Sequence, residues 1–423
     1  MVHKRKKLGL VLAGGASLGA YQVGAIKALD QLGYQFDIVT GTSIGALNGA
    51  LVCAKQNDRI IDIWNKVTPE TVMANGVNIT KDTFKDVNSD IFKSFRTLSK
   101  NYLFNGFSVD IKPFRKFVKE NIDIEACQKS NIKFGIVAVE FPSFKEIDIN
   151  MNLVNKDKFL SWIHASSACT PVFPAEKIDG KTYIDGFFRD NLPIRLAFKY
   201  GADEVFAIDM RFLDLEPQHK FFLSMPNVHY IAPYIQLGSF LDFDNKEILR
   251  RIQIGYFDTM KYFHKYKGYM WTFKTNTLRS HGFLIWLYKS FDLKAKFVLE
   301  ELKEDIRGVM DETDYYVRSL EILAKALGVE KHEFVYTNDE FIALIKENIN
   351  HHLKYVTPLK LTKKLVKVLK GDNTNKITPK KINTMTDYLI IFSSEFLNLT
   401  NMDGTPMIKE SWLKHNLWKK IFK

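Results

Sequence analysis

The sequence predicts a three-layer α/β/α fold, in which a mainly parallel sheet lies between helices, followed by a mostly helical C-terminal region. In the first half of the chain, short apolar runs typical of buried strands alternate with helix-like segments, and glycine-rich turns join the first two strands to their helices. This alternation is typical of parallel sheets covered by helices. After residue 213, aromatic and helix-period segments dominate instead.

The first predicted strand, 8–13, leads into Gly14-Gly15-Ala16-Ser17-Leu18-Gly19, and a helix is expected from Ala20 to Leu32. Such a loop exposes consecutive backbone N–H groups at the start of a helix, where they can bind a phosphate or an oxyanion. The sequence therefore predicts an anion-binding loop at this point.

Three kinds of loop bind anions in this setting. A Walker loop is excluded because no Gly-Lys-Ser/Thr follows. A dinucleotide fingerprint fits at Gly14 and Gly19 only, since Ala16 stands at the middle glycine position and no acidic residue ends the second strand. We favour the third kind, an oxyanion hole formed by the N–H groups of Gly14, Gly15 and Ala16.

The second predicted strand, 36–40, leads into Gly41-Thr42-Ser43-Ile44-Gly45, and a helix follows over 46–54. Strand, sharp turn and helix is the setting in which Gly-x-Ser-x-Gly forms a nucleophile elbow. The turn needs residues without bulk around the serine, which explains Gly41 and Gly45. Ser43 is the predicted nucleophile, placed where a helix N-terminus stabilises negative charge. The alternative is a Gly/Ser-rich turn without a chemical role.

A third motif is the alternating run Tyr183-Ile184-Asp185, which closes a short predicted strand before Gly186. Asp-Gly pairs are usually plain turns, and Asp179-Gly180 is interpreted in that way. Asp185 differs because its carboxylate would be held at the end of a strand.

With these motifs in this order, the chain resembles the patatin-like phospholipases, lipid acyl hydrolases that use a Ser–Asp dyad without histidine. The resemblance covers roughly residues 6–212. It implies that Ser43 attacks an acyl ester and that Asp185 accepts its proton. The same resemblance assigns Gly19 and Gly186 to the support of the motifs. The implied substrate is a phospholipid, a lysophospholipid or another acyl ester.

The sequence departs from the family pattern at three positions. Ala16 and Leu18 stand where the glycine-rich loop often has a third glycine and a basic residue, and Phe187 follows Asp-Gly in place of a small residue. Alanine still offers an N–H, so the hole is kept if the backbone angles of Ala16 suit a Cβ. A soluble carboxylesterase, a thioesterase, an acyltransferase and a lipid-surface protein with a decayed dyad are the alternative functions.

A Ser-Asp-His triad is the alternative mechanism. Its late histidine candidates, His351, His352 and His415, lie in a Lys-rich region without a strand-then-loop setting. His164 lies on a predicted helix, 158–168, and is expected to be a packed residue. We therefore favour the dyad.

Cysteine usage and apolar runs predict the cellular setting. Cys53, Cys127 and Cys169 are far apart and odd in number, which argues against a disulfide framework and favours a reducing cytoplasm. No Cys/His cluster has metal-ligand spacing, so neither a metal nor a cofactor is expected. No apolar run reaches the roughly 18 residues that a spanning helix needs. Residues 4–13 imitate a signal peptide, but cleavage near Ala20 would remove the anion-binding loop.

Positive charge is concentrated near the C-terminus. The chain has a net charge of +12, and residues 351–423 hold 14 lysines, no arginine and 5 acidic residues. Amphipathic stretches of this kind contact an anionic membrane, or they dock on the protein and keep their lysines in solvent. We favour docking on the protein. A nucleic-acid partner is not expected, because no binding motif or arginine cluster is present.

The predicted organisation is a catalytic domain over 1–225 and a mostly helical region over 226–423, with the boundary between Leu213 and Pro226. The polar segment 66–105 is expected to form a cap or lid over the site. Further strands are predicted at 133–139 and 204–209, and further helices within 246–268 and 295–327.

Overall fold

The structure is a computed structural model that describes residues 5–74, 110–170, 172–212, 217–278, 312–326 and 329–353. The chain divides into two compact units, Met1–Tyr262 and Phe263–Lys423. Each unit is described by itself.

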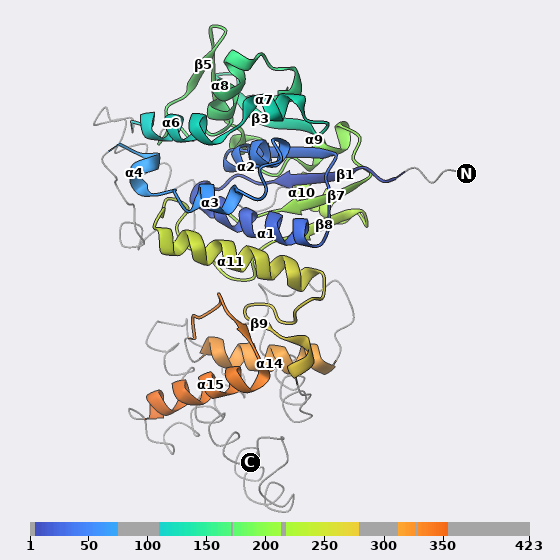
Figure 1. Cartoon of the computed structure of the whole chain (residues 1–423), viewed down its shortest axis with the longest axis vertical. Helices are drawn as coiled ribbons and strands as arrows, with labels where there is room; N and C mark the ends of the chain where they lie inside the picture. Colours follow the sequence, from blue (N-terminus) through green and yellow to red (C-terminus); the bar gives the residue numbers. More distant parts are fainter. Residues whose placement is uncertain are drawn as a thin grey trace, which may run out of the picture. The chain divides into compact units, whose positions relative to one another are not determined.

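The first unit is built around an 8-stranded sheet with the order β5-β6-β3-β2-β1-β7-β8, in which β4 pairs with β3 (Figure 1). The strands are β1 (Leu8–Leu12), β2 (Ile38–Thr42), β3 (Lys133–Phe141), β4 (Lys145–Asn150), β5 (Glu176–Ile178), β6 (Lys181–Asp185), β7 (Glu204–Ile208) and β8 (Val228–Ile231). Pairing is parallel from β3 through β2, β1 and β7 to β8. It is antiparallel between β3 and β4, β3 and β6, and β5 and β6. The predicted mainly parallel sheet is confirmed.

Helices join these strands and cover the sheet. They are α1 (Gly19–Gln31), α2 (Ile44–Cys53), α3 (Ile60–Trp64), α4 (Pro69–Val72), α6 (Lys112–Asn121), α7 (Ile124–Lys129), α8 (Lys156–Ser166), α9 (Ile194–Lys199), α10 (Pro217–Leu223) and α11 (Asn245–Tyr262). Short 3-10 helices are η1 (Ala16–Leu18), η3 (Met151–Leu153) and η4 (Gly186–Phe188).

Successive residues of β3 show that helices pack on both faces of the sheet. A Cβ on Gly49 of α2 would lie 2.9 Å from the ring of Phe134. A Cβ on the next residue of the strand, Gly135, would lie 3.0 Å from the side chain of Leu196 in α9. Because successive side chains of a strand point to opposite faces, α2 and α9 lie on opposite sides of the sheet. The predicted three-layer arrangement is confirmed.

Strands in the middle of this sheet are buried on both faces, which accounts for their continuous apolar sequences. In β1, Leu10, Val11 and Leu12 are fully buried. All residues of β2 are buried as well. The carboxyl ends of these two neighbouring strands carry the glycine-rich loop and the elbow, so the register of the sheet brings both turns to one edge.

Helix α11 belongs to the first unit and packs closely along α1. A Cβ on Gly24 of α1 would lie 1.8 Å from the carbonyl oxygen of Ile252, and a Cβ on Gly255 of α11 would lie 1.9 Å from the carbonyl oxygen of Tyr21. Only glycine permits such an approach of two backbones. The first unit therefore ends at Tyr262 and includes β8 and α11, which follow the expected boundary at residue 225. Composition changes near that boundary because helices replace strands, while the core continues.

The second unit has a small aromatic core in its described part. Its elements are β9 (Thr272–Phe273), η5 (Thr275–Thr277), α14 (Glu312–Ala326), β10 (Val335–Tyr336) and α15 (Asn338–Leu353). The strands β9 and β10 pair in parallel. The ring of Phe341 contacts those of Trp271, Phe273 and Tyr336. The described part of this unit thus consists of two helices, two short strands and one 3-10 helix.

Some expectations fall wholly or partly outside the described residues. The expected cap over 66–105 is described only up to residue 74, the expected helical segment 295–327 only over 312–326, and the basic segment 351–423 only over 351–353. Among the described helices, none has both the length and the apolar character needed to cross a bilayer.

Candidate active site

Ser43 lies at a sharp turn between β2 and α2. Its backbone angles are φ 56° and ψ −124°, a region that residues with a side chain rarely adopt. Flanking glycines allow the turn to close. A Cβ on Gly41 would lie 2.3 Å from the carbonyl oxygen of Gly45, and a Cβ on Gly45 would lie 2.1 Å from that of Leu12. The conformation is that of a nucleophile elbow, with its serine at the start of a helix.

Sheet register brings Ser43 and Asp185 to the same place. Thr42, the last residue of β2, pairs with Val137 of β3 in the parallel direction. Asp185, the last residue of β6, pairs with Ala138 of β3 in the antiparallel direction. Because β4 occupies the other edge of β3, β2 and β6 pair with consecutive parts of the same edge. The two strands run toward each other, so Ser43 and Asp185 meet where the strands end. Gly186 permits this approach, because a Cβ there would lie 2.4 Å from the carbonyl oxygen of Val137.

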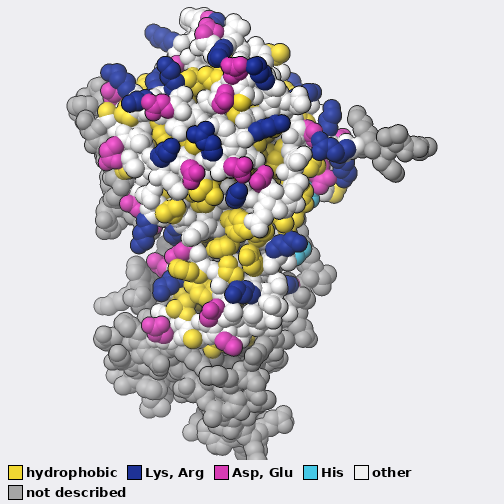
Figure 2. Space-filling model, in the orientation of Figure 1, with side chains coloured by type: hydrophobic (Ala, Val, Ile, Leu, Met, Phe, Trp, Pro, Cys, Tyr) yellow, Lys and Arg dark blue, Asp and Glu magenta, His cyan; other side chains and the backbone are white. Residues whose placement is uncertain are grey.

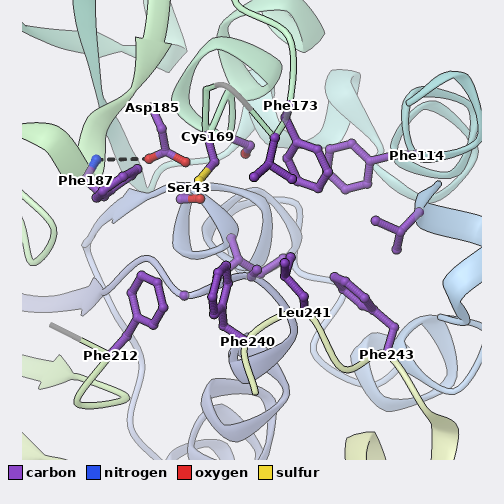
Figure 3. Close-up of a pocket in the computed structure, with 16 residues that line it drawn as sticks. Ser43, Phe114, Cys169, Phe173, Asp185, Phe187, Phe212, Phe240, Leu241 and Phe243 are labelled. Carbon is purple, nitrogen blue, oxygen red and sulfur yellow. Dashed lines mark hydrogen bonds between the residues drawn. The ribbon is translucent and has the colours of Figure 1, made fainter. Parts of the chain in front are cut away.

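The carboxyl group of Asp185 is almost completely buried, with 1% of the residue exposed. Its Oδ1 accepts a hydrogen bond from the Phe187 backbone N–H at 2.9 Å (Figure 3). Its Oδ2 is buried and has no partner of normal hydrogen-bond geometry among the described residues. Burial raises the pKa of Asp185 to about 7, while the Phe187 N–H and the nearby Ser43 hydroxyl oppose the rise. Asp185 thus combines a pKa near neutrality with an unused oxygen beside the serine.

Ser43 and Asp185 line a pocket whose walls are mostly apolar and rich in phenylalanine (Figure 3). Its phenylalanines are Phe114, Phe173, Phe187, Phe212, Phe240 and Phe243. They come from segments far apart in the sequence, so the pocket is a product of the tertiary fold. Ser43 and Asp185 therefore face an apolar cavity, which suits a hydrocarbon chain attached to a reactive polar group.

The glycine-rich loop lies beside the elbow, and Gly15 and Ala16 line the same pocket as Ser43. The N–H of Gly14 donates to the carbonyl of Asn191 at 3.2 Å. Among the described residues, no hydrogen bond uses the N–H groups of Gly15 and Ala16. These two groups are therefore the candidate oxyanion donors, and Gly14 supports the loop.

Ala16 occupies the left-handed region with φ 46°, a conformation that favours glycine. The departure from the glycine pattern at this position is therefore accommodated with strain in the backbone, and the N–H is retained. Gly19 has a different role, since a Cβ there would lie 2.5 Å from the side chain of Ile44. Its absent side chain lets the first helix approach the elbow.

Comparisons with known proteins show which proteins the chain is similar to. Residues 10–198 match the family model of patatin-like phospholipases. Lysophospholipase nte1 of Aspergillus terreus is 27% identical over 221 residues, which cover 49% of this chain and 12% of that protein. Neuropathy target esterase sws of Drosophila melanogaster is 26% identical over 217 residues, which cover 48% of this chain and 13% of that protein. The chain thus spans a small part of these relatives' length.

Residues 10–198 belong to the patatin-like phospholipase family. Among solved structures, the chain is similar to VipD from Legionella pneumophila, with 14% sequence identity, coverage of 93% of this chain and 87% of that chain, and a TM-score of 0.39. The matched range contains the glycine-rich loop, the elbow and Asp185. It ends before Phe212 and the segment 237–243, which also contribute to the pocket of the patatin-like domain.

Two residues of the patatin-like site had no assigned role in the sequence. The Ser166 hydroxyl accepts from the Ser43 N–H at 3.0 Å and donates to the carbonyl of Val137 at 2.7 Å, which fixes the elbow to β3. Cys169 lines the pocket, and burial together with the charge of Asp185 raises its pKa well above the ordinary value. It is therefore present as a thiol. Ser166 lies within the run Ala165-Ser166-Ser167-Ala168, and Cys169 follows it directly.

Histidine is not part of the described site. His164 is buried on α8, as expected for a packed residue, and lies against the ring of Phe114. Burial and the charge of Arg115 lower its pKa to about 4. The side chains of His351 and His352, and all of His415, lie outside the described residues.

Charge is mixed on the visible surface of the protein. On the face drawn in Figure 2, Lys and Arg side chains alternate with Asp and Glu and do not gather into one basic patch.

Within the described ranges, no group of at least three His, Cys, Asp or Glu side chains could hold a metal ion. The candidate site offers a serine hydroxyl, a carboxyl group and backbone amides.

Proposed function

We propose that this protein hydrolyses acyl esters of lipids through a Ser–Asp dyad made of Ser43 and Asp185. The observation that carries the proposal is the meeting of a strained elbow serine and a buried carboxyl oxygen without a partner, at the wall of an apolar pocket. Membership of residues 10–198 in the patatin-like phospholipase family supports the choice of a lipid ester as substrate.

The reaction follows from the positions of these groups. Asp185 accepts the hydroxyl proton of Ser43 as the serine oxygen attacks the ester carbonyl. The N–H groups of Gly15 and Ala16 stabilise the resulting oxyanion, and one such donor contributes about 3 kcal/mol to the transition state. The alcohol leaves with the proton from Asp185, and an acyl-enzyme remains. Water, activated by the same carboxylate, then releases the fatty acid.

The aromatic pocket is the proposed site of the acyl chain. Phe187 stands directly after Gly186 and lines the pocket together with Asp185. A bulky residue at this point brings apolar surface close to the reacting carbonyl. Burial of each methylene group of a fatty acyl chain contributes about 0.8 kcal/mol to binding. We therefore expect esters of longer acyl chains to bind more tightly than acetate esters.

A fluorophosphonate probe tests the nucleophile. Wild-type protein is expected to be labelled, and Ser43→Ala is expected to lose labelling while it remains folded. Ser224→Ala is a matched control, because that hydroxyl is exposed and donates to the carbonyl of Phe221 away from the pocket. Absence of labelling in folded wild-type protein would favour the decayed-dyad alternative.

Substrate form separates the remaining alternatives. Hydrolysis of phospholipid vesicles is compared with hydrolysis of short p-nitrophenyl esters and an acyl thioester by the same preparation. A lipid acyl hydrolase is expected to release fatty acid from vesicles in a Ser43-dependent reaction. Activity confined to the short esters or the thioester would favour the soluble esterase or thioesterase. Transfer of the acyl group to an added alcohol in preference to water would favour an acyltransferase.

Contact with an anionic membrane through residues 351–423 is the alternative to the docking on the protein that we favour, and the 14 lysines and 5 acidic residues of that segment support it. Sedimentation with vesicles tests it. Binding is expected to anionic vesicles but not to zwitterionic ones, and to weaken as salt rises. Equal binding to both kinds of vesicle would contradict an electrostatic contact.

A further inference from the structure

The patatin-like site is contacted from outside the matched family range by a buried arginine. Arg251 lies on α11, after residue 198, where the family match ends. Its residue exposure is 0%. Burial of a charged group is costly unless hydrogen bonds replace its hydration. The hydrogen-bond acceptors of this guanidinium therefore show which segments it connects.

The guanidinium donates hydrogen bonds in several directions at once. Nε donates to the carbonyl of Leu237 at 3.0 Å, and Nη2 donates to the carbonyl of Ser239 at 3.0 Å. Nη1 donates to the carbonyl of Asp242 at 2.7 Å and to the hydroxyl of Ser17 at 2.9 Å. One side chain thus joins α11, the pocket segment 237–243 and the glycine-rich loop.

Every acceptor in this set is a neutral oxygen. Within the described part of the chain, no carboxylate oxygen lies within ion-pair distance of the Arg251 guanidinium. Burial lowers its pKa to about 10, and the charges of Asp242 and Glu247 oppose the shift. Arg251 is therefore charged at neutral pH, and its positive charge is not cancelled by a direct ion pair.

Ser17 transmits this contact to the oxyanion loop. Its N–H donates to the carbonyl of Phe240 at 2.9 Å, and its hydroxyl donates to the carbonyl of Ser239 at 3.3 Å. Ser17 directly follows Ala16, the residue in the left-handed conformation. Because Ser17 is held by its backbone and its side chain, the peptide plane between the two residues cannot rotate freely. Relaxation of Ala16 to an unstrained conformation would break these bonds.

We propose that Arg251 is the positioning residue of the oxyanion loop. Arg251 holds Ser17 and thereby the N–H groups of Gly15 and Ala16, and it supplies the positive charge that the loop lacks at Leu18. The inference rests on the proposed hydrolysis at Ser43. Arg251 acts through Ser17 and does not touch the reacting atoms. The same bonds hold Phe240 at the pocket wall, so one buried charge sets both the loop and the wall that faces it.

Variants of this contact test the proposal with a short ester as substrate. Arg251→Met removes the charge and the hydrogen bonds, and Ser17→Ala removes only the hydroxyl that connects the guanidinium to the loop. Arg250→Met is the matched control, since Arg250 is the neighbouring residue and pairs with Glu247 at 3.1 Å on the helix surface. The kcat of each variant is expressed per site titrated to completion with fluorophosphonate, so that misfolded molecules do not contribute.

A displaced oxyanion donor is expected to reduce kcat with little change in KM. We expect a loss of about 100-fold for Arg251→Met and about 10-fold for Ser17→Ala. Arg250→Met is expected to keep the wild-type kcat. Arg251→Lys, which retains the charge, is expected to fall between wild type and Arg251→Met.

Wild-type kcat per site in both Arg251→Met and Ser17→Ala would overturn the proposal, as would a change confined to KM. If Arg251→Met does not fold, Ser17→Ala decides between the outcomes. Ser43→Ala separates this result from a failure of the proposed function. If wild type and Ser43→Ala hydrolyse the ester equally, the proposed function is wrong and the inference falls with it. If only Ser43→Ala is inactive while Ser17→Ala keeps the wild-type kcat, the function stands and the inference alone is wrong.

Discussion

Two turns at the ends of neighbouring strands form the site, and they are held in different ways. The elbow after β2 places Ser43 at φ 56°, and the glycine-rich loop after β1 places Ala16 at φ 46°. The elbow is fixed mainly by backbone packing around Gly41 and Gly45. The loop is fixed by hydrogen bonds that it donates to the carbonyls of Asn191 and Phe240, and by the hydrogen bond that the Ser17 hydroxyl accepts from Arg251.

This difference separates local from distant control of a strained backbone. In the elbow, two glycines within the same pentapeptide remove the bulk that would prevent the turn. In the loop, partners up to 234 residues away impose the conformation on an alanine. We infer that the elbow tolerates changes elsewhere in the fold, whereas the loop depends on segments that arrive from the end of the first unit.

The largest expected effect comes from the partner of the elbow serine. Asp185→Asn is expected to lower kcat about 10⁴-fold, the order of loss that follows removal of the acid–base partner of a catalytic serine. Single-turnover measurements with a chromogenic ester check this expectation. Retention of more than about a tenth of the wild-type kcat would exclude Asp185 as the base.

The stability of Asp185→Asn at different pH values tests whether Asp185 is buried with a raised pKa. Burial raises the pKa of the folded Asp185 to about 7, whereas an exposed aspartate titrates near ~3.9. The folded state therefore binds the proton more tightly, and the contribution of Asp185 to stability falls as pH rises between these two values. Asp185→Asn is expected to raise the melting temperature at pH 8 relative to wild type, with a smaller difference at pH 4. An equal difference at both values would contradict the pKa shift.

Gly45→Ala tests whether the elbow is held by backbone packing. A Cβ at this position would lie 2.1 Å from the carbonyl oxygen of Leu12, so a loss of about 3 kcal/mol or more in unfolding free energy is expected. Gly33→Ala is the control, because it has φ 84° and no atom within 4 Å of the added Cβ. Backbone strain alone should cost about 1 kcal/mol there. Equal urea midpoints for the two variants would show that packing does not hold the elbow.

The pH dependence of kcat/KM tests the state of the dyad. Asp185 must be deprotonated to accept the serine proton, so activity is expected to fall as pH drops through about 7 and to level off above it. Well below that value, kcat/KM should fall about tenfold per pH unit. The residual reaction of Asp185→Asn serves as a control and should lack this step. A wild-type profile that is flat from pH 5 to 8 would count against the assigned base.

The smallest effect is expected at the loop. Ala16→Gly removes the strain of a left-handed alanine, worth about 1 kcal/mol, but gives the unfolded chain more freedom, so stability should change by less than about 1 kcal/mol. Because Ser17 and its partners hold the loop, kcat should stay within about twofold of wild type. Calorimetry and steady-state kinetics check the two expectations. A loss of kcat beyond tenfold would mean that the alanine Cβ itself shapes the oxyanion hole.

Much of the fold could be predicted because its signals are local. Continuous apolar runs marked the buried strands 8–13 and 36–40, and the glycines around Ser43 marked the turn between strand and helix. The end of the first unit could not be read in this way. Composition changes after residue 213, but β8 and α11 still belong to the same core, because sheet pairing and the contact at Gly24 and Gly255 decide membership.

The candidate site was predictable to a different extent in each part. Ser43 and Asp185 could be named from their motifs, since each motif includes glycines that the turn needs. The sequence could not show that the Gly14 N–H donates a hydrogen bond whereas those of Gly15 and Ala16 do not, because the acceptor is the distant carbonyl of Asn191. Arg251 and the pocket segment 237–243 carried no signal at all.

By itself, the sequence determined which residues could be nucleophile and base, because strand, turn and glycine preferences act over a few neighbouring residues. The tertiary structure decided that these residues meet, through the register by which β2 and β6 end at Val137 and Ala138 of one strand. It also decided the raised pKa of Asp185 and the support of the glycine-rich loop. Burial and hydrogen bonding at those points involve atoms that are distant along the chain, and no local pattern encodes them.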